Sequence, residues 1–322
     1  MDFSASDVVR DLRGLLAAGR FRDVLDRHAA VGSPAPEAAL VAATAATRLG
    51  ELPAATSLAE DAMGRFRVRA DQDGLLRTLN LMGAIGFERG DLESAAERFE
   101  RALGVARSLG DRLMTARALN NAASVMHLRG DAETALSRYR EALLVYQSLG
   151  DRRGAAETYH NLGLVYREEG ELEEAERMAE HAVRHATLAR MPGLLSLALT
   201  GRAEIALARA DAALAEEALD RADALAAEAE DAAGQAEILR IRSLVALNRG
   251  QLNQALEWSR LARERARELG SLLLEAESAV VAARALTRLS RTDEAGEMRS
   301  EAAELFRRLG AAAHLSRLEE ED

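Results

Sequence analysis

Cysteine and lysine are both absent from this chain of 322 residues. Without cysteine the chain can form no disulfide, no thiolate nucleophile and no cysteine-ligated zinc site. All 42 basic residues are therefore arginines, which excludes a P-loop lysine, Schiff-base chemistry and a lysine general base. The sequence thus rules out several large classes of enzyme before any motif is considered.

Positive charge and long apolar runs are also scarce. The 42 basic residues stand against 53 acidic ones, a formal net charge of −11. We therefore expect no nucleic-acid or anionic membrane partner, because phosphate binding depends on clustered positive charge. No run approaches the roughly 18 apolar residues that a membrane span requires, and the acidic start MDFSASDVVRD is unlike a secretory signal. These features predict a cytoplasmic protein.

A repeat of 40 residues runs through most of the chain. Turn signals recur at this spacing at Gly50, Gly90, Gly130, Gly170 and Gly250, with Ala210 and Ser290 where glycine is missing. A second series lies half a period away, at Gly110, Gly150, Gly270 and Gly310. The segments between the turns consist of strong helix formers, and their apolar residues recur at i, i+3, i+4 and i+7. Each period therefore predicts a hairpin of a first helix, A, and a second helix, B.

The turn residues themselves suit helix ends. Glycine adopts the left-handed conformation that closes a helix. The Asp or Glu that follows is expected in the first turn of the next helix, where the helix dipole favours negative charge.

Alanine marks every second helix of the repeat. One series consists of Ala55, Ala95, Ala135, Ala175, Ala215, Ala255 and Ala295, and the other, seven residues later, of Ala62, Ala102, Ala142, Ala182, Ala222, Ala262 and Ala302. Residues seven apart lie on one stripe of a helix, and a methyl group there lets two helices approach closely. A larger side chain would overpack the contact at a cost of about 1–3 kcal/mol.

At these positions the sequence resembles the tetratricopeptide repeat family. The signature residues are clearest in one copy, at Tyr159, Leu162, Gly163, Tyr166, Gly170, Ala175 and Ala182. The family's usual repeat is about 34 residues and often closes with proline, whereas the repeat here closes with Leu-Gly-Asp. This longer form is similar to the repeats of kinesin light chains, of Leu-Gly-Asn cell-polarity adaptors and of bacterial peptide sensors and regulator modules.

The resemblance implies an all-α protein, a right-handed α-α superhelix of about eight helical hairpins with a short C-terminal cap. We expect a single solenoid over 1–322. It would comprise an irregular N-terminal hairpin in 1–31, seven repeats in 32–310, and a cap with an acidic tail in 311–322. In such solenoids the A helices line a concave groove that binds peptides.

Repeat positions that point into this groove form the candidate binding site: Arg77, Asn80, Phe87, Arg117, Asn120, Asn121, Ser124, His127, His160, Asn161 and Arg167. Asn80 and Asn120 are one period apart, and Asn121 and Asn161 form a second such pair. An amide offers a donor and an acceptor together, so a column of asparagines can pair with a peptide backbone. Alternatively these asparagines fill solvated positions, or Asn121 and Asn161 are buried between A helices.

The arginines of this set predict an acidic peptide or a free C-terminal carboxylate as ligand, because guanidinium meets carboxylate with two parallel hydrogen bonds. The alternative is that Glu88, Glu157 and Glu168 pair with these arginines inside the protein. Farther along the chain the same inward positions become apolar, at Leu197, Leu207, Leu244 and Leu247. An exposed leucine patch would mark a protein interface, whereas a tighter superhelix would bury it.

No catalytic fingerprint is present. His181 and His185 are four residues apart on a B helix, but no third ligand accompanies them, so we expect no metal and no cofactor. The sequence therefore predicts a non-catalytic scaffold with a protein or peptide partner. Two alternatives stay open: a module that forms a homodimer through its C-terminal repeats, and a subunit that senses a ligand for a regulatory complex.

Overall fold

The structure is a computed structural model that describes residues 5–32 and 35–320. Every regular element in these residues is an α-helix, so the predicted all-α class is confirmed. Residues 1–4 of the predicted N-terminal hairpin and residues 321–322 of the predicted acidic tail lie outside the described part. None of the described helices is both long and apolar enough to cross a membrane.

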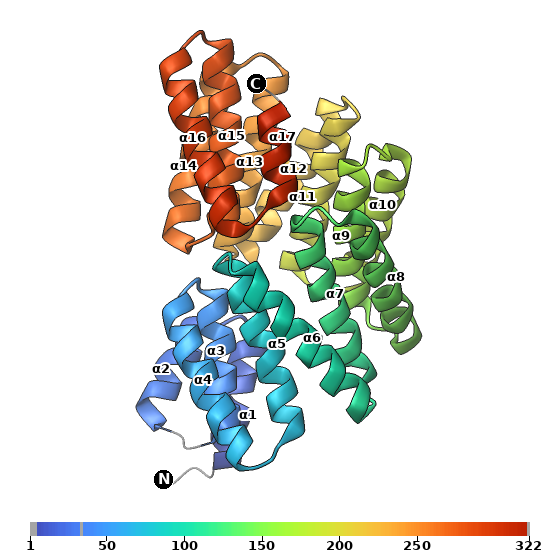
Figure 1. The fold of residues 1–322 in the computed structure, drawn as a ribbon, viewed down its shortest axis with the longest axis vertical. Coiled ribbons are helices and arrows are strands. Elements are labelled where there is room, and N and C mark those ends of the chain that lie inside the picture. The colour runs from blue at the N-terminus through green and yellow to red at the C-terminus, as the bar shows by residue number, and fades with distance from the viewer. Residues whose placement is uncertain (1–4, 33–34, 321–322) are drawn as a thin grey trace. The chain divides into compact units, whose positions relative to one another are not determined.

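The chain divides into two compact units, unit 1 (residues 1–118) and unit 2 (residues 119–322), which are described separately (Figure 1). The first seven helices are α1 (Ala5–Ala17), α2 (Phe21–Val31), α3 (Pro36–Arg48), α4 (Leu52–Val68), α5 (Gln72–Glu88), α6 (Leu92–Leu109) and α7 (Arg112–Leu128). The next five are α8 (Ala132–Leu149), α9 (Arg152–Glu168), α10 (Leu172–Ala189), α11 (Pro192–Ala208) and α12 (Ala212–Glu228). The last five are α13 (Ala232–Asn248), α14 (Leu252–Leu269), α15 (Leu272–Arg288), α16 (Thr292–Leu309) and α17 (Ala312–Glu320).

From α3 to α16 the odd-numbered helices are the A helices and the even-numbered ones the B helices. The predicted hairpins and the short cap, α17, therefore appear at the expected places in the chain. The unit boundary falls inside α7, an A helix. The single solenoid over all residues stays a prediction.

The helix ends follow the turn series read from the sequence. All the glycines of the two series have a positive φ, as expected for a left-handed helix end. At the turns without glycine, Ala70, Arg190, Ala210, Glu230 and Ser290 adopt the same conformation. The aspartates that follow many turns lie one residue before the helix rather than in its first turn. For example, the carboxylate of Asp151 accepts a hydrogen bond from the backbone N–H of Gly154 at 3.0 Å, which makes it an N-cap.

The two alanine series form the contacts between helices. All fourteen of these alanines are buried: Ala55, Ala62, Ala95, Ala102, Ala135, Ala142, Ala175, Ala182, Ala215, Ala222, Ala255, Ala262, Ala295 and Ala302. The predicted role of these methyl groups in close packing is thereby confirmed. Large side chains fill the spaces between them, such as Phe66 and Phe99 in unit 1 and Tyr139 and Phe306 in unit 2.

Glycine inside the A helices lets aromatic rings approach the backbone. In unit 2 the ring of Tyr146, on α8, lies so close to Gly154, on α9, that an added Cβ would be 2.2 Å from its Cε1. Phe66 and Gly74 repeat this arrangement in unit 1, where an added Cβ would be 2.2 Å from the ring. Each glycine thus provides the seat for a buried ring from the preceding B helix.

Replacing Gly154 with alanine should therefore lower the stability of unit 2. The new methyl group would displace the buried ring of Tyr146, and we expect a loss of about 1–3 kcal/mol in the free energy of unfolding. The measurement is the midpoint of urea unfolding followed by circular dichroism. Gly296→Ala is the matched control, because nothing lies within 4 Å of an added Cβ on α16. That substitution should stabilise the helix by about 0.5–1 kcal/mol. Equal stability of the two variants would contradict the packing described here.

Candidate functional site

A chain of ion pairs links successive A helices of unit 2. On α9, Arg167 Nη2 lies 3.0 Å from Glu168 Oε1, and Arg167 also pairs with Glu204 on α11. Arg240 Nη2, on α13, lies 3.1 Å from Glu204 Oε1, and Arg240 Nε lies 3.4 Å from Glu277 Oε2 on α15. We call the side of these helices that carries this chain the A-helix face of unit 2.

The central members of the chain are buried, and their pairing keeps them ionised. Burial alone would raise the pKa of Glu204, but Arg167 and Arg240 outweigh it and lower this pKa to about 2. Burial would likewise lower the pKa of Arg240, yet the carboxylates of Glu237, Glu277 and Glu204 raise it well above its usual value. These residues therefore stay charged near neutral pH, as a preformed set of charges.

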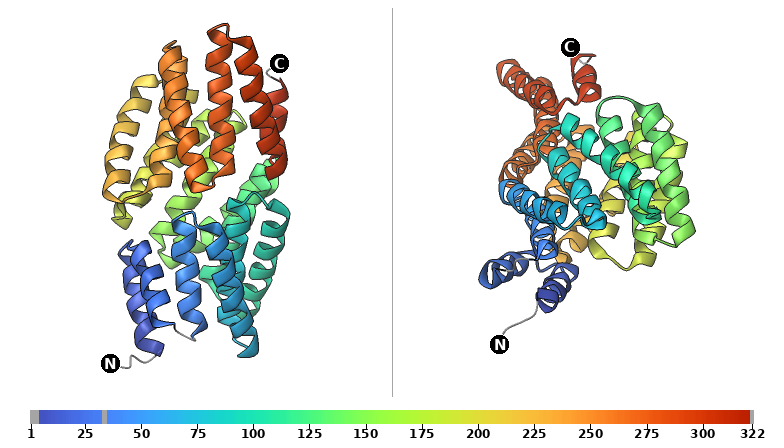
Figure 2. Two further views of the ribbon diagram at one scale, coloured as in Figure 1. Left: turned by 90° about the vertical axis from the view of Figure 1, so that its left-hand side faces the viewer. Right: turned by 60° about the horizontal axis from the view of Figure 1, so that its bottom comes forward.

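The terminal helix α17 adds two further partners of these carboxylates. His314 Nε2 lies 3.3 Å from Glu277 Oε1, and Arg317 Nη2 lies 2.8 Å from Glu168 Oε2. At the N-terminal end of α17, a Cβ added to Gly130, in the α7–α8 turn, would lie 3.5 Å from the Cβ of Ala313. Figures 1 and 2 show α17 beside α16 and close to the α7–α8 turn. Thus α17, which follows the last hairpin, contacts both α9 and the α7–α8 turn near the start of unit 2.

Glu168 is contacted both by the terminal helix α17 and by α7, at the start of unit 2. Its carboxylate accepts from Arg317, and its Oε2 lies 2.9 Å from His127 Nε2 on α7. Burial would raise the pKa of Glu168, but His127, Arg167 and Arg317 lower it far below its usual value. Glu168 therefore remains a carboxylate held by three cationic or hydrogen-bonding groups.

Comparison with known proteins identifies the repeat. The family profile described as tetratricopeptide repeat matches residues 114–187. Residues 114–187 are tetratricopeptide repeats. No curated protein matches the sequence.

Solved structures of tetratricopeptide-type solenoids share the fold. A Rap protein complexed with Competence and Sporulation Factor matches with a TM-score of 0.66 at 12% identity, over 98% of this chain and 96% of that one. The Rap conjugation gene regulator of plasmid pLS20, in complex with the Phr* peptide, matches with a TM-score of 0.61 at 15% identity, over 85% and 78%. Cut9-Hcn1 of the APC/C matches with a TM-score of 0.64 at 15% identity, over 98% and 56%. At these identities the likeness shows the fold alone.

Several residues of the candidate groove on α7 use their polar atoms inside the protein. Asn120 is only 8% exposed, and its Oδ1 accepts a hydrogen bond from Thr158 Oγ1 at 2.9 Å. The hydroxyl of Ser124 lies 2.9 Å from that of Tyr139. Asn120 and Ser124 thus tie tetratricopeptide helices to one another, while Asn121 and Asn161 are half-buried. A role for the asparagine column in binding a peptide backbone stays a prediction.

The candidate arginines are paired. In unit 1, Arg77 Nε donates to Asp73 Oδ2 at 2.8 Å, and Arg117 Nη1 lies 3.9 Å from Met114 Sδ. In unit 2, Arg167 pairs with Glu168 and Glu204. Asn80 and Phe87 of the same predicted set also belong to unit 1 and are half-buried. Of the carboxylates named in that alternative, Glu168 pairs with Arg167, whereas Arg77 pairs with Asp73 on its own helix.

The four leucines at the later inward positions do not form one exposed patch. Leu247 is 9% exposed and packs against Val281 and Ala285. Leu207 and Leu244 are half-buried against the core between α11 and α13. Only Leu197, at 39%, counts as exposed among the four. Packing between neighbouring hairpins buries Leu247 and partly covers Leu207 and Leu244, and an apolar interface made of the four stays a prediction.

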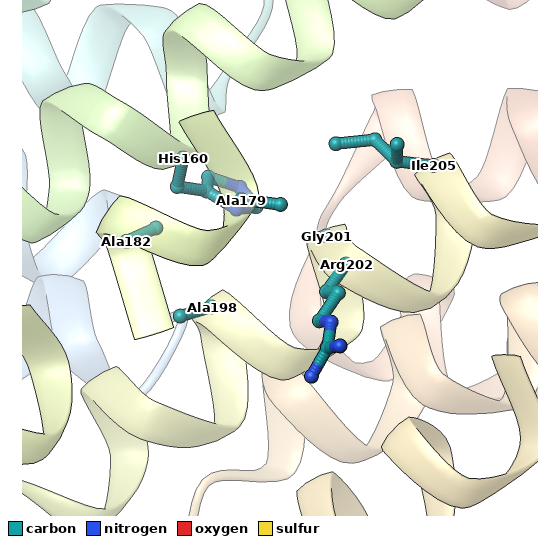
Figure 3. A pocket seen from close by; sticks show the side chains of 7 residues that line it. All are labelled: His160, Ala179, Ala182, Ala198, Gly201, Arg202 and Ile205. Atoms are coloured by element: carbon teal, nitrogen blue, oxygen red, sulfur yellow. The ribbon is translucent and has the colours of Figure 1, made fainter. Parts of the chain in front are cut away.

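His160 is a packing residue in this structure. Figure 3 shows its ring in a pocket with Gly201 and Ile205 of α11 and with alanines of α10 and α11. A Cβ on Gly201 would lie 2.4 Å from His160 Nδ1, so only glycine leaves room for the ring. Burial lowers the pKa of His160 to about 4, which removes it from the cations available to an acidic peptide at neutral pH.

The buried His160 should make the protein less stable as the pH falls from about 7 to about 4. In this range the unfolded chain binds a proton near pH 6.5, whereas the folded chain does not, so protonation favours unfolding. The ring resonances of His160 in NMR spectra should titrate near pH 4. His160→Gln should reduce the slope of unfolding free energy against pH between 4 and 6.5. Titration of the ring near 6.5 would contradict this assignment.

The sequence indicated Glu168 as a possible partner of the arginines, but Glu204, Glu277 and the contact with α17 were not predicted. The signal that could have revealed these pairs is the sequence separation of the two partners, which is slightly shorter than the 40-residue repeat. Arg240 pairs with Glu204 36 residues away, and His314 with Glu277 37 residues away. One turn of helix is about four residues, so neighbouring A helices are offset by about one turn where these charges meet. His181 and His185 take no part in this site. The centroids of their rings lie 4.7 and 5.3 Å from the centroid of the Tyr159 ring.

Proposed function

We propose that this chain is a non-catalytic scaffold that binds a peptide or protein segment on the A-helix face of unit 2. The observation that supports this most is the ion-pair chain itself, because five residues from four A helices present fixed charges on one face. A preformed polar surface on rigid helices loses little conformational entropy when it binds. Rap proteins of similar fold have been solved in complex with a peptide and with Competence and Sporulation Factor.

The ligand we propose differs from the acidic peptide expected from the sequence. Arg167 and Arg240 are already shared among carboxylates, and Arg77 is paired with Asp73. An acidic segment would have to compete with these internal partners in a region that already holds Glu168, Glu204 and Glu277. Binding on this face is therefore expected to favour segments without clustered negative charge. The homodimer alternative stays open, although Leu247, one of the four leucines on which it rested, is buried.

A peptide library provides the test, because the natural ligand need not be known. Peptides selected from a random library on the wild-type protein would be titrated calorimetrically against Leu197→Glu. Leu197 is 39% exposed on α11 and occupies the repeat position of Glu237 and Glu277, so the substitution adds charge to the proposed face without disturbing the core. We expect affinity to fall at least tenfold, because a contact made by the leucine would have to accommodate a desolvated carboxylate.

Leu144→Glu is the matched control. This leucine lies on the B helix α8 and is 68% exposed, so the same substitution should leave binding unchanged. Circular dichroism would verify that both variants are folded. If both variants bound the selected peptides as the wild type does, the ligand would bind elsewhere and the proposed face would be wrong.

A further inference from the structure

The short helix α17 lies on the A-helix face as a ligand would. It consists of nine residues and follows Gly310, whose φ of 66° ends α16. His314 and Arg317 are three residues apart, on one side of the helix, and reach Glu277 on α15 and Glu168 on α9. The contacts of α17 therefore span from the last hairpin to the third helix of unit 2.

Apolar residues of α17 anchor it beside these ion pairs. Leu318 is buried in a cluster that includes Phe306 and Leu309, and Leu315 packs against the same cluster. The ring of His314 lies 5.1 Å from that of Phe306. Glu319, at the end of α17, is exposed. The helix is thus amphipathic, with His314, Arg317 and its leucines towards the protein and its acidic end towards solvent.

The charge of the face explains why its occupant turns an arginine, Arg317, and a histidine, His314, towards it. Four glutamates on it, Glu168, Glu204, Glu237 and Glu277, stand against Arg167 and Arg240 on the same helices. The two outer carboxylates, Glu168 and Glu277, complete their contacts with α17. Among the described residues, a helix that replaced α17 without donors at these places would leave Glu168 with only His127 and Arg167, and Glu277 with only Arg240, in a site with little solvent.

The fit of α17 is incomplete, so a better occupant can exist. Leu318 lines a cavity of about 290 Å³ together with Leu247, Val280 and Arg288. The side chain of Arg317 is 42% exposed. The buried Nδ1 of His314 has no hydrogen-bond partner among the described residues. Helices shorter than about 12 residues are marginal on their own, so α17 depends on these imperfect contacts.

From these observations we infer that α17 is an internal, displaceable ligand of the A-helix face. The external ligand is a short amphipathic helix with a histidine-like donor and an arginine-like cation three residues apart, leucine-like anchors and an apolar side chain large enough to enter the cavity. This inference rests on the proposed function and specifies its ligand. Binding would exchange one helix for another and release α17 from Glu168 and Glu277.

The test uses the full chain and a labelled synthetic peptide with the sequence of residues 311–320, AAAHLSRLEE. In Arg317→Glu the substitution places a carboxylate against Glu168, which should release α17 and leave the face open to the peptide. Fluorescence anisotropy should then show at least tenfold tighter binding of the peptide than in the wild type. Ser316→Glu adds a carboxylate at an exposed position of the same helix and should behave as the wild type.

A second peptide, with glutamate at the position of Arg317, should bind none of the three proteins detectably. Equal binding of the original peptide to wild type and Arg317→Glu would overturn the inference, as would tighter binding to Ser316→Glu. This result is distinguishable from failure of the proposed function. If library-selected peptides bound Leu197→Glu more weakly but bound Arg317→Glu as they bind the wild type, the A-helix face would still be the binding site. Only the proposed role of α17 would then be wrong.

Hydrogen exchange gives a readout on the unaltered protein. At a saturating concentration of a library-selected peptide, the backbone amides of residues 312–320 should exchange at least tenfold faster than in the free protein, because α17 has been displaced from the A-helix face. Amides of α16 should keep their protection. Unchanged or slower exchange in α17 would show that the peptide binds without displacing it and would overturn the inference even if Arg317→Glu failed to fold.

Discussion

The close approach of helices at alanine is the constraint on which the rest of the structure depends. Where a methyl group is the largest side chain in the contact, two helix backbones can pack closely, and the offset between them is fixed by that contact. The series from Ala135 to Ala302 is buried in every hairpin of unit 2. Glycine extends the same principle, since Gly154 and Gly201 bring the rings of Tyr146 and His160 against a helix backbone. Small residues thus determine where the larger ones can lie.

The offset between helices in turn determines which charges meet. Arg240 pairs with Glu204 and with Glu277 because neighbouring A helices are displaced by about one turn. Glu237 and Glu277, which are one full repeat apart, both contact Arg240, so this arginine separates two carboxylates. The electrostatic arrangement of the face is therefore a consequence of the alanine contacts. This dependence joins the packing of the core to the chemistry of the surface.

Because the charge pairs depend on how the helices pack, and the packing depends on local residues, the local features could be predicted from the sequence more readily than the charge pairs. Local signals were sufficient for the helix hairpins, for the left-handed turns at residues such as Gly150, and for the buried alanines, because each depends on a few neighbouring residues. The repeat alignment placed Asn120 and His160 on A helices but could not show that Thr158 and Gly201 cover them. The pairing of Glu168 with Arg317 joins residues 149 apart in the sequence. No repeat position encodes that contact, because it depends on the summed offset of all the hairpins between them.

The A-helix face carries more carboxylates than arginines, and this excess determines which groups can bind there. Paired with well-placed arginines, buried glutamates cost little, whereas removing one partner of a buried pair costs about 3–5 kcal/mol. The side chain of Glu168 is only 12% exposed, so losing Arg317 would leave it more dependent on His127 and Arg167. Without α17, Glu168 would keep His127 and Arg167 and Glu277 would keep Arg240, so α17 completes the pairing of these carboxylates. Two helices that neutralise the same carboxylates cannot bind together, so occupation by one excludes the other. The same electrostatic requirement that holds α17 in place would make its exchange for a ligand competitive.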